Sequence, residues 1–269
     1  MFKRLRLTSC LAENTHALGR ALAGYLTQRL GMTAEFVEDV SWQERERMLD
    51  VGQVHLGWIC GLLYAWKASQ PEAPVRLLAA PVPAAPRYRQ RPVYFSDLVV
   101  RRASPYRSFA DLEGATWIYN EPRSYSGYFA MGHHLVQQDL DLDYFGGLVE
   151  SGAHLHSLEL LRQGRGDVTI IDSTVLDDAR HREPALRQEI RVLASLGPSP
   201  IPPWVVSSTV PRAWRQRLRR LFLTMHTDPL GRAVLDAHQV SSFATVDDED
   251  YQTIRTTTAA AAAEAGLVA

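Results

Sequence analysis

The sequence predicts an α/β protein of two lobes connected by two chain crossovers. Short apolar runs alternate with segments whose apolar residues recur every three or four positions, a pattern typical of β-strand–α-helix units around a largely parallel sheet. Two proline-rich breaks, near residues 93 and 197, enclose a middle segment. We therefore expect a discontinuous first lobe of residues 1–93 and 198–269 and a second lobe of residues 94–197, with the C-terminal helices packing back on the first.

Composition excludes several protein classes. The chain has 269 residues, of which 46% are hydrophobic, so it can bury a sizeable core and is not disordered, collagen-like or a disulfide scaffold. Its 29 Lys and Arg against 30 Asp and Glu leave a net charge of -1, so no global field draws it to nucleic acid. Because no apolar run approaches the ~18 residues of a membrane span, we expect no membrane insertion.

The first part of the chain carries a regular alternation of predicted elements. Apolar spacing after Leu18 indicates a helix that ends at Gly31, a common residue at helix C-termini. Ser41 and Glu44 form a capping box that begins the next helix. In order, we predict a strand at residues 5–7, a helix at 18–30, a strand at 34–40, a helix ending near 52, a strand at 54–60, a helix from 61 and a strand at 75–82.

The pattern restarts in the middle segment. We predict strands at residues 94–101, 116–120, 167–172 and 191–195, and helices at 108–112, from the 121–127 loop toward 138, at 155–162 and from 173. After the second break, at 197–203, we predict a mostly helical remainder: 211–225, 228–238 and an alanine-rich helix after 251.

A turn between a strand and a helix, residues 120–128, has the chemistry of an anion site. Hydroxyls of Ser124 and Ser126 and the first backbone amides of the helix would face one spot at the positive end of the helix dipole. The alternative is ordinary capping, in which one of these serines satisfies the first turn and nothing binds.

Histidines stand in a second turn of the same kind, residues 151–157. His154 can donate a hydrogen bond to an oxyanion whether neutral or charged. The alternative is a solvated surface histidine. A metal site at His154 and His156 lacks further ligands at matching spacing, so no metal is expected.

Two further strand ends carry reactive side chains. Asp172 either caps the helix that follows or pairs with an ammonium group of a ligand. Cys60 stands near Trp58 in apolar sequence, which predicts a buried thiol with a raised pKa and little reactivity. No local signature supports a Cys60–His154 nucleophile, so we assign no catalytic residue and expect no cofactor.

Several stretches, in order over nearly the whole chain, together resemble one family. They are residues 54–64 (VHLGWICGLLY), 94–114 with SFADLEG, 121–127 (EPRSYSG), 152–157, 166–176, 228–231 and 250–251. They are similar to segments of the phosphate/phosphite/phosphonate-binding proteins of ABC transporters, a branch of the type 2 periplasmic binding proteins. The loop departs from the family pattern at Glu121, where Asp is common, and at Tyr125, where Thr is common.

The resemblance implies a Venus-flytrap fold that clamps a small phosphonate-, phosphite- or phosphate-like oxyanion between two lobes. It assigns the anion to Ser124, Tyr125 and Ser126, with His154 opposite, and the organic end of the ligand to Tyr94 and Asp172. Trp58, Cys60 and Tyr64 are implied to lie at the ligand site. The implied role is non-enzymatic solute binding for ABC-type uptake or sensing, with a permease or a sensor or regulator protein as partner.

One alternative is a cytosolic enzyme or biosynthetic protein on the same scaffold that uses Cys60 or His154.

The N-terminal residues also bear on the cellular compartment of the protein. The basic residues 1–9 precede no apolar signal segment, so the chain as written is expected in the cytoplasm, whereas a mature form with its signal removed would be periplasmic.

Overall fold

The computed structural model describes residues 4–264, which form two compact α/β units. One unit contains the chain up to Val93 together with Pro200–Gln252, and the other contains Tyr94–Ser199 and the helix from Thr253 onward. The terminal helix, expected in the first lobe, therefore belongs to the second unit, and the chain passes between the units a third time. Residues 1–3 and 265–269, which fall within our expected first lobe, lie outside the described residues.

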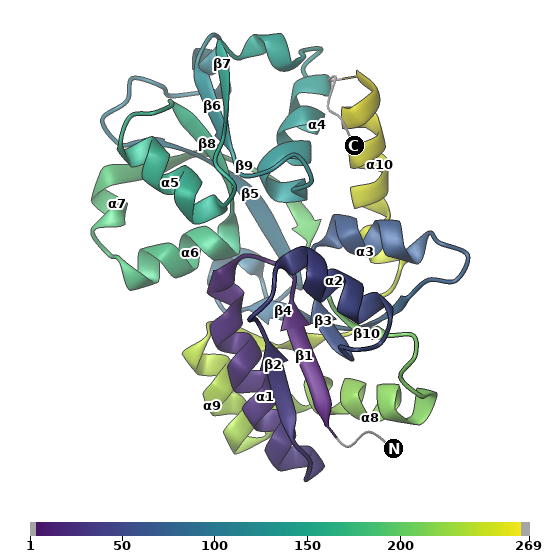
Figure 1. The fold of residues 1–269 in the computed structure, drawn as a ribbon. Coiled ribbons are helices and arrows are strands. Elements are labelled where there is room, and N and C mark those ends of the chain that lie inside the picture. Colours follow the sequence, from purple (N-terminus) through teal and green to yellow (C-terminus); the bar gives the residue numbers. More distant parts are fainter. Residues whose placement is uncertain (1–3, 265–269) are drawn as a thin grey trace. The chain divides into compact units, whose positions relative to one another are not determined.

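The first unit, whose strands β1 to β4 and β10 are labelled in Figure 1, is built on a six-stranded sheet in the order β11-β4-β10-β3-β1-β2. Its strands are β1 (Leu5–Ser9), β2 (Ala34–Val37), β3 (Leu56–Trp58), β4 (Val75–Pro83), β10 (Trp204–Ser207) and β11 (Val240–Ala244). Strand β1 pairs in parallel with β2 and β3, while β10 runs antiparallel to β3 and β4.

The prediction of a mostly helical remainder after residue 203 was wrong for β10 and β11. Every residue of β10 is buried, because the strand lies between two neighbours in the sheet. A four-residue run that is buried throughout shows no alternation of polar and apolar residues, and two prolines precede it.

Five helices complete this unit: α1 (His16–Leu30), α2 (Trp42–Asp50), α3 (Gly61–Ala68), α8 (Arg212–Leu223) and α9 (Pro229–Ala237). Two predicted helix ends are confirmed. Gly31 caps α1 at a φ of 66°, in the left-handed region that glycine adopts without strain. Ser41 accepts from the Glu44 amide at the start of α2. The core includes Leu22 and Leu26 of α1, Leu218 and Phe222 of α8, and Trp204 of β10.

The second unit holds a five-stranded sheet in the order β7-β6-β8-β5-β9. The strands are β5 (Val93–Arg101), β6 (Thr116–Tyr119), β7 (Gly147–Glu150), β8 (Val168–Asp172) and β9 (Ile190–Pro200). The 151–157 turn was expected to follow a strand, but our prediction gave no bounds for that strand, β7, because it is a short edge strand that holds no fully buried residue. Strand β6 pairs in parallel with both β7 and β8.

The helices of the second unit are α4 (Ala130–Val136), α5 (His154–Arg162), α6 (Ser173–Arg182), α7 (Leu186–Glu189) and α10 (Gln252–Glu264). Helix α10 runs beside α4 (Figure 1), and its Thr253 and Thr257 share a cavity with His133 of α4. Ile254 and Ala261 of α10 are fully buried. An alanine-rich sequence indicates a helix, but it does not indicate which sheet the helix packs beside.

Candidate ligand-binding site

Three parallel strands of the second unit end at the same edge of its sheet and bring the predicted turns there. Tyr119 at the end of β6 lies opposite Glu150 at the end of β7, and β6 also pairs with β8. Beyond the strands, the Ser151 amide donates to the Tyr119 carbonyl at 2.9 Å and the Gly152 amide donates to the Asn120 carbonyl at 2.7 Å. The order of the strands therefore holds the 120–127 turn next to the 151–154 turn.

A side-chain hydrogen bond joins the two turns. Ser126 Oγ lies 3.1 Å from His154 Nε2, and both side chains are buried. Burial lowers the pKa of His154 to about 4, because desolvation disfavours the charged imidazolium. The imidazole is therefore neutral at pH 7, and its buried Nδ1 has no hydrogen-bond partner.

The capping alternative holds for Ser124 but leaves Ser126 available. Ser124 Oγ accepts from the Gly127 amide at 3.0 Å, at the start of a turn of π-helix, Tyr125–Phe129, that leads into α4. Such turns are frequent at functional sites. Of the two serines, one stabilises the turn and the other points at the histidine.

Asn120 is a site residue that our sequence prediction missed. It is buried, and its Oδ1 has no hydrogen-bond partner. A Cβ on Gly127 would come within 1.8 Å of Asn120 Oδ1 and 3.0 Å of His154 Cε1, so the three residues are packed tightly. Unpaired buried polar atoms are rare in native proteins and call for a partner. The signal was the position of Asn120, which directly follows β6 as the first residue of the turn.

Glu121, where the family commonly has the shorter Asp, keeps a carboxyl group beside this turn. Burial raises the pKa of Glu121, the charge of Arg123 opposes that rise, and the charge of Glu150 adds to it. A nearby carboxylate disfavours a bound anion, so the neutral form of Glu121 suits such a ligand better.

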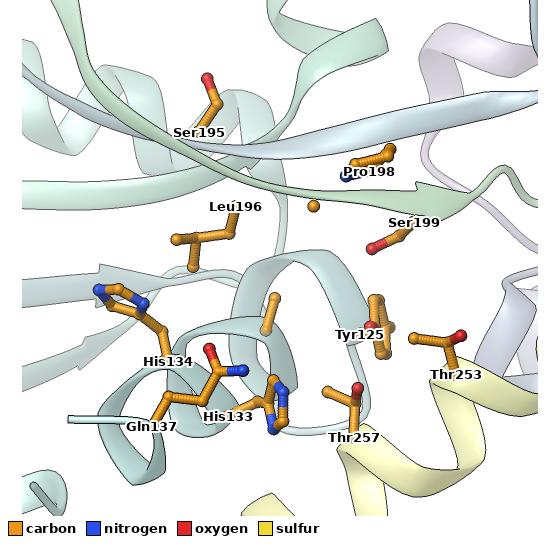
Figure 2. A pocket seen from close by; sticks show the side chains of 12 residues that line it. Tyr125, His133, His134, Gln137, Ser195, Leu196, Pro198, Ser199, Thr253 and Thr257 are labelled. Carbon is orange, nitrogen blue, oxygen red and sulfur yellow. The ribbon is translucent and has the colours of Figure 1, made fainter. Parts of the chain in front are cut away.

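The buried side chain of Tyr125 lies away from the contact between Ser126 and His154. It lines a cavity of about 390 Å³ (Figure 2), whose other lining residues come from α4, β9 and α10. They are Ala130, His133, His134, Gln137, Ser195, Leu196, Gly197, Pro198, Ser199, Thr253 and Thr257. Neither Ser126 nor His154 lines this cavity. A role for the Tyr125 hydroxyl in anion binding stays a prediction.

Asp172 lies at the end of β8 and caps α6. Its Oδ1 accepts from the Thr174 amide at 2.8 Å and from the Thr174 hydroxyl at 2.7 Å. Burial raises the pKa of Asp172 to about 6, although both hydrogen bonds from Thr174 oppose the rise. Tyr94 is buried at the start of β5, near the position where Ser96 pairs with Asp172. Contact of Tyr94 and Asp172 with the organic end of a ligand stays a prediction.

In the first unit, Trp58 ends β3, and Cys60 lies two residues further on. The Trp58 indole N–H donates to the Pro202 carbonyl at 2.9 Å, and its ring stacks on Trp204 at 5.6 Å between centroids. Both cysteines are reduced thiols. The prediction that Cys60 is buried was wrong, since it is partly exposed at the N-terminus of α3. Cys10 has the same intermediate exposure, and desolvation raises the pKa of its thiol to about 12, which makes that thiol unreactive.

Tyr64 of α3 is buried and held by two partners. Its hydroxyl donates to Asp248 Oδ1 at 2.8 Å, and its ring packs edge-on against Tyr251 at 4.9 Å between centroids. Tyr251 in turn donates to the Ile201 carbonyl. The implied roles of Trp58, Cys60 and Tyr64 at a ligand site stay predictions, while Trp58 and Tyr64 form hydrogen bonds within their own unit.

Residues 4–264 contain neither a candidate metal site nor a helix that could cross a membrane. No group of three or more His, Cys, Asp and Glu side chains in this range could hold a metal ion. Across the same residues, none of the helices has both the length and the apolar character needed to cross a membrane.

Comparison with known proteins identifies the family. The model of the family described as "ABC transporter, phosphonate, periplasmic substrate-binding protein" matches residues 9–251. The chain belongs to this family. No curated protein matches it in sequence. Substrate-binding proteins of ABC transporters bind small-molecule ligands and interact with a permease, and they are not enzymes.

Solved structures confirm the predicted fold, that of the type 2 periplasmic binding proteins. A binding-protein component of an ABC phosphonate transporter from Pseudomonas aeruginosa matches with a TM-score of 0.80 at 17% identity, over 94% of this chain and 85% of that one. PhnD1 from Prochlorococcus marinus, in complex with methylphosphonate, matches with a TM-score of 0.79 at 15% identity, over 95% and 97%. The aliphatic sulphonate binding protein SsuA from Escherichia coli matches with a TM-score of 0.62 at 16% identity, over 96% and 86%.

Proposed function

We propose that this family member binds a small phosphonate-like oxyanion at the turns that carry Ser126 and His154, for uptake through an ABC permease. The observation that supports the ligand class is the 3.1 Å approach of Ser126 Oγ to His154 Nε2. It joins a turn rich in hydroxyls to a turn that begins a helix, within one unit of the protein. Serine hydroxyls, backbone amides and imidazole N–H groups are suitable donors for phosphonate oxygens.

A neutral His154 supports this chemistry through Ser126. A neutral imidazole carries one N–H, and a proton on Nε2 donates to Ser126 Oγ. The serine hydroxyl proton is then directed at an oxygen of the ligand. His154 acts in this arrangement without a positive charge, which agrees with the lowering of its pKa to about 4.

The start of α5 adds backbone donors. Helix α5 begins at His154, and the preceding residue, Ala153, provides no side-chain cap. The amides of the first turn, together with the positive end of the helix dipole, favour a negative ligand. Hydrogen bonds to a charged group contribute about 1.5–3 kcal/mol each, so four or five donors give micromolar or tighter binding.

Calorimetric titration of the purified protein tests the ligand class. The panel consists of methylphosphonate, aminoalkylphosphonates, phosphite, phosphate and methanesulfonate. We expect binding of at least one phosphorus oxyanion in the micromolar range or tighter. Lack of heat across the panel, from protein that unfolds cooperatively, would contradict the proposed ligand class.

Substitutions locate the site. Ser126→Ala and His154→Ala should each raise the dissociation constant about 10- to 100-fold, because each removes a donor or its orientation. His156→Ala is the matched control, since this exposed histidine lies two residues away and contacts the Ser151 carbonyl. Equal affinity in all three variants would place the site elsewhere.

Delivery to a permease also requires the protein on the outer side of the cytoplasmic membrane. We propose that location, supported by the family. Recovery of the protein from cell fractions tests it, and a purely cytoplasmic protein would argue against uptake and for the sensing role.

A further inference from the structure

We propose that the solvent-facing side of helix α8, in the first unit, binds the anionic phospholipid headgroups of a membrane surface. The helix has the sequence RAWRQRLRRLFL and contains no acidic residue. Its five arginines are Arg212, Arg215, Arg217, Arg219 and Arg220. The whole chain carries a net charge of only -1, so this positive charge is a local feature (α8 in Figure 1).

Burial separates α8 into an apolar side and a basic side. Leu218 and Phe222 are buried in the hydrophobic core of the first unit, with Trp214 and Leu221 packed against it. Arg212, Arg217 and Arg220 are exposed. At 100° per residue, these three positions fall on the side opposite Leu218 and Phe222, so the outward face is basic along the length of the helix.

The arginines of α8 differ from those on other helices of the same unit. Arg20 pairs with Glu38, Arg29 with Asp228 and Arg47 with Glu44. Within the described residues, by contrast, no carboxylate pairs with any of the five arginines of α8, and Arg217 contacts only the Trp214 ring, at 5.2 Å.

Helix stability does not account for this cluster. Like charges three or four residues apart destabilise a helix, and Arg212, Arg215 and Arg219 have that spacing. Arg212 and Arg215 also lie in the first turn, at the positive end of the helix dipole, where cations are disfavoured. An external anion would relieve both repulsions.

The residues on the exposed side favour a lipid surface over a protein partner. Protein interfaces rely on aromatic and apolar anchors at their centre. The exposed residues of α8 are Arg212, Ala213, Gln216, Arg217 and Arg220. Guanidinium groups bind phosphate in a bidentate manner, and a row of them suits a plane of phosphodiesters. Because the apolar side of α8 lies in the core, binding is peripheral and weakened by salt.

Co-sedimentation of the full chain with vesicles tests this proposal. We expect binding to vesicles of phosphatidylcholine mixed with phosphatidylglycerol at low ionic strength, loss of that binding at high ionic strength, and no binding to phosphatidylcholine alone. The triple variant Arg212→Gln, Arg217→Gln, Arg220→Gln should bind about 100-fold more weakly, from about 1 kcal/mol for each arginine near the surface.

Two further variants keep the test specific. Changing the same three residues to Lys retains the charge and should retain most of the binding. Changing Arg4, Arg20 and Arg182 to Gln removes the same charge at exposed positions outside α8 and should leave binding unchanged. If the α8 Gln variant fails to fold, the Lys variant and the salt dependence decide the question.

Three results would overturn the proposal. They are no binding of the wild-type chain to the anionic vesicles, an equal loss in the variant of Arg4, Arg20 and Arg182, or binding to soluble polyglutamate without binding to vesicles. The last result would indicate an acidic protein as partner instead of a membrane.

Discussion

The two units use the carboxyl ends of their parallel strands differently. In the second unit these ends carry polar groups that contact each other across turns, as Ser126 and His154 do. In the first unit the corresponding ends carry Trp58, which stacks on Trp204 and bonds to the Pro202 carbonyl. Buried polar atoms without partners occur in both units: Asn120 Oδ1 and His154 Nδ1 lie at strand ends of the second unit, and Asn14 Oδ1 and Trp204 Nε1 lie in the first.

This difference bears on which unit can offer hydrogen-bonding groups to a ligand. A group can bind a ligand only with atoms that the fold leaves available, and the indole N–H of Trp58 is already used by a carbonyl. In the second unit, by contrast, the turns hold their side chains in place, and the donors proposed for the ligand are the Ser126 hydroxyl and the first amides of α5. The proposal for oxyanion binding therefore rests on the geometry of the second unit alone.

The largest expected effect comes from removing one buried tryptophan from each unit. Trp204→Ala and Trp117→Ala should each lower the free energy of unfolding by about 3–5 kcal/mol, because both side chains are fully buried. Trp117 also stacks on Tyr128 of the π-helical turn at 5.5 Å, so only its loss should weaken oxyanion binding. Urea unfolding measures the free energy of unfolding, and calorimetric titration at low temperature measures the affinity for the oxyanion. Equal affinity in both variants would contradict the contrast between the units.

A second effect concerns pH, because two buried groups of the second unit are shifted in opposite directions. The raised pKa of Asp172, about 6 against 3.8, makes stability fall as pH rises from about 4 to 6. The lowered pKa of His154, about 4 against 6.5, makes stability rise over nearly the same range. Each contribution is about 3 kcal/mol, so the two largely cancel in the wild-type protein.

Asp172→Asn exposes the contribution of His154. Asparagine keeps an oxygen that can cap α6, and the variant should gain up to about 3 kcal/mol over the wild type between pH 4 and 7. Urea unfolding at a series of pH values measures the difference. A difference that does not change with pH would mean that Asp172 titrates normally.

The smallest effects come from two glycines. Gly127→Ala pushes a Cβ against Asn120 Oδ1, so it should destabilise the protein by about 1–3 kcal/mol and weaken oxyanion binding. Gly24→Ala, in the exposed interior of α1, has no atom within 4 Å of the new Cβ and should stabilise by about 0.5–1 kcal/mol. Thermal unfolding measures the change in stability of each variant. If both changes had the same sign, close packing at Gly127 would not be what determines the effect of an added Cβ.

Sequence patterns predicted the long elements and the turns better than the short strands. Helix α1 and its cap at Gly31 follow from local spacing and from the one conformation that glycine adopts without strain. Strands β10 and β11 were missed and β7 was given no bounds, because a strand of four or five residues is stabilised by its neighbours in the sheet and not by its own pattern.

The residues of the candidate site were likewise predicted only in part from the sequence. Ser126 and His154 were predicted from turns between strands and helices, where donors gather for local reasons. Asn120 was missed and Tyr125 lines a different cavity, because the direction of a side chain in a turn depends on which residues pack around it.

By itself, the sequence determined the alternation of strands and helices, the polar turns that follow β6 and β8, and the family, since these depend on residues close together in the chain. Only the tertiary structure decided that β7 lies next to β6, that α10 belongs to the second unit, and that the arginines of α8 have no carboxylate partner among the described residues. Each of these depends on pairing between segments far apart in the chain, and the burial and charge of a site are set by such pairing.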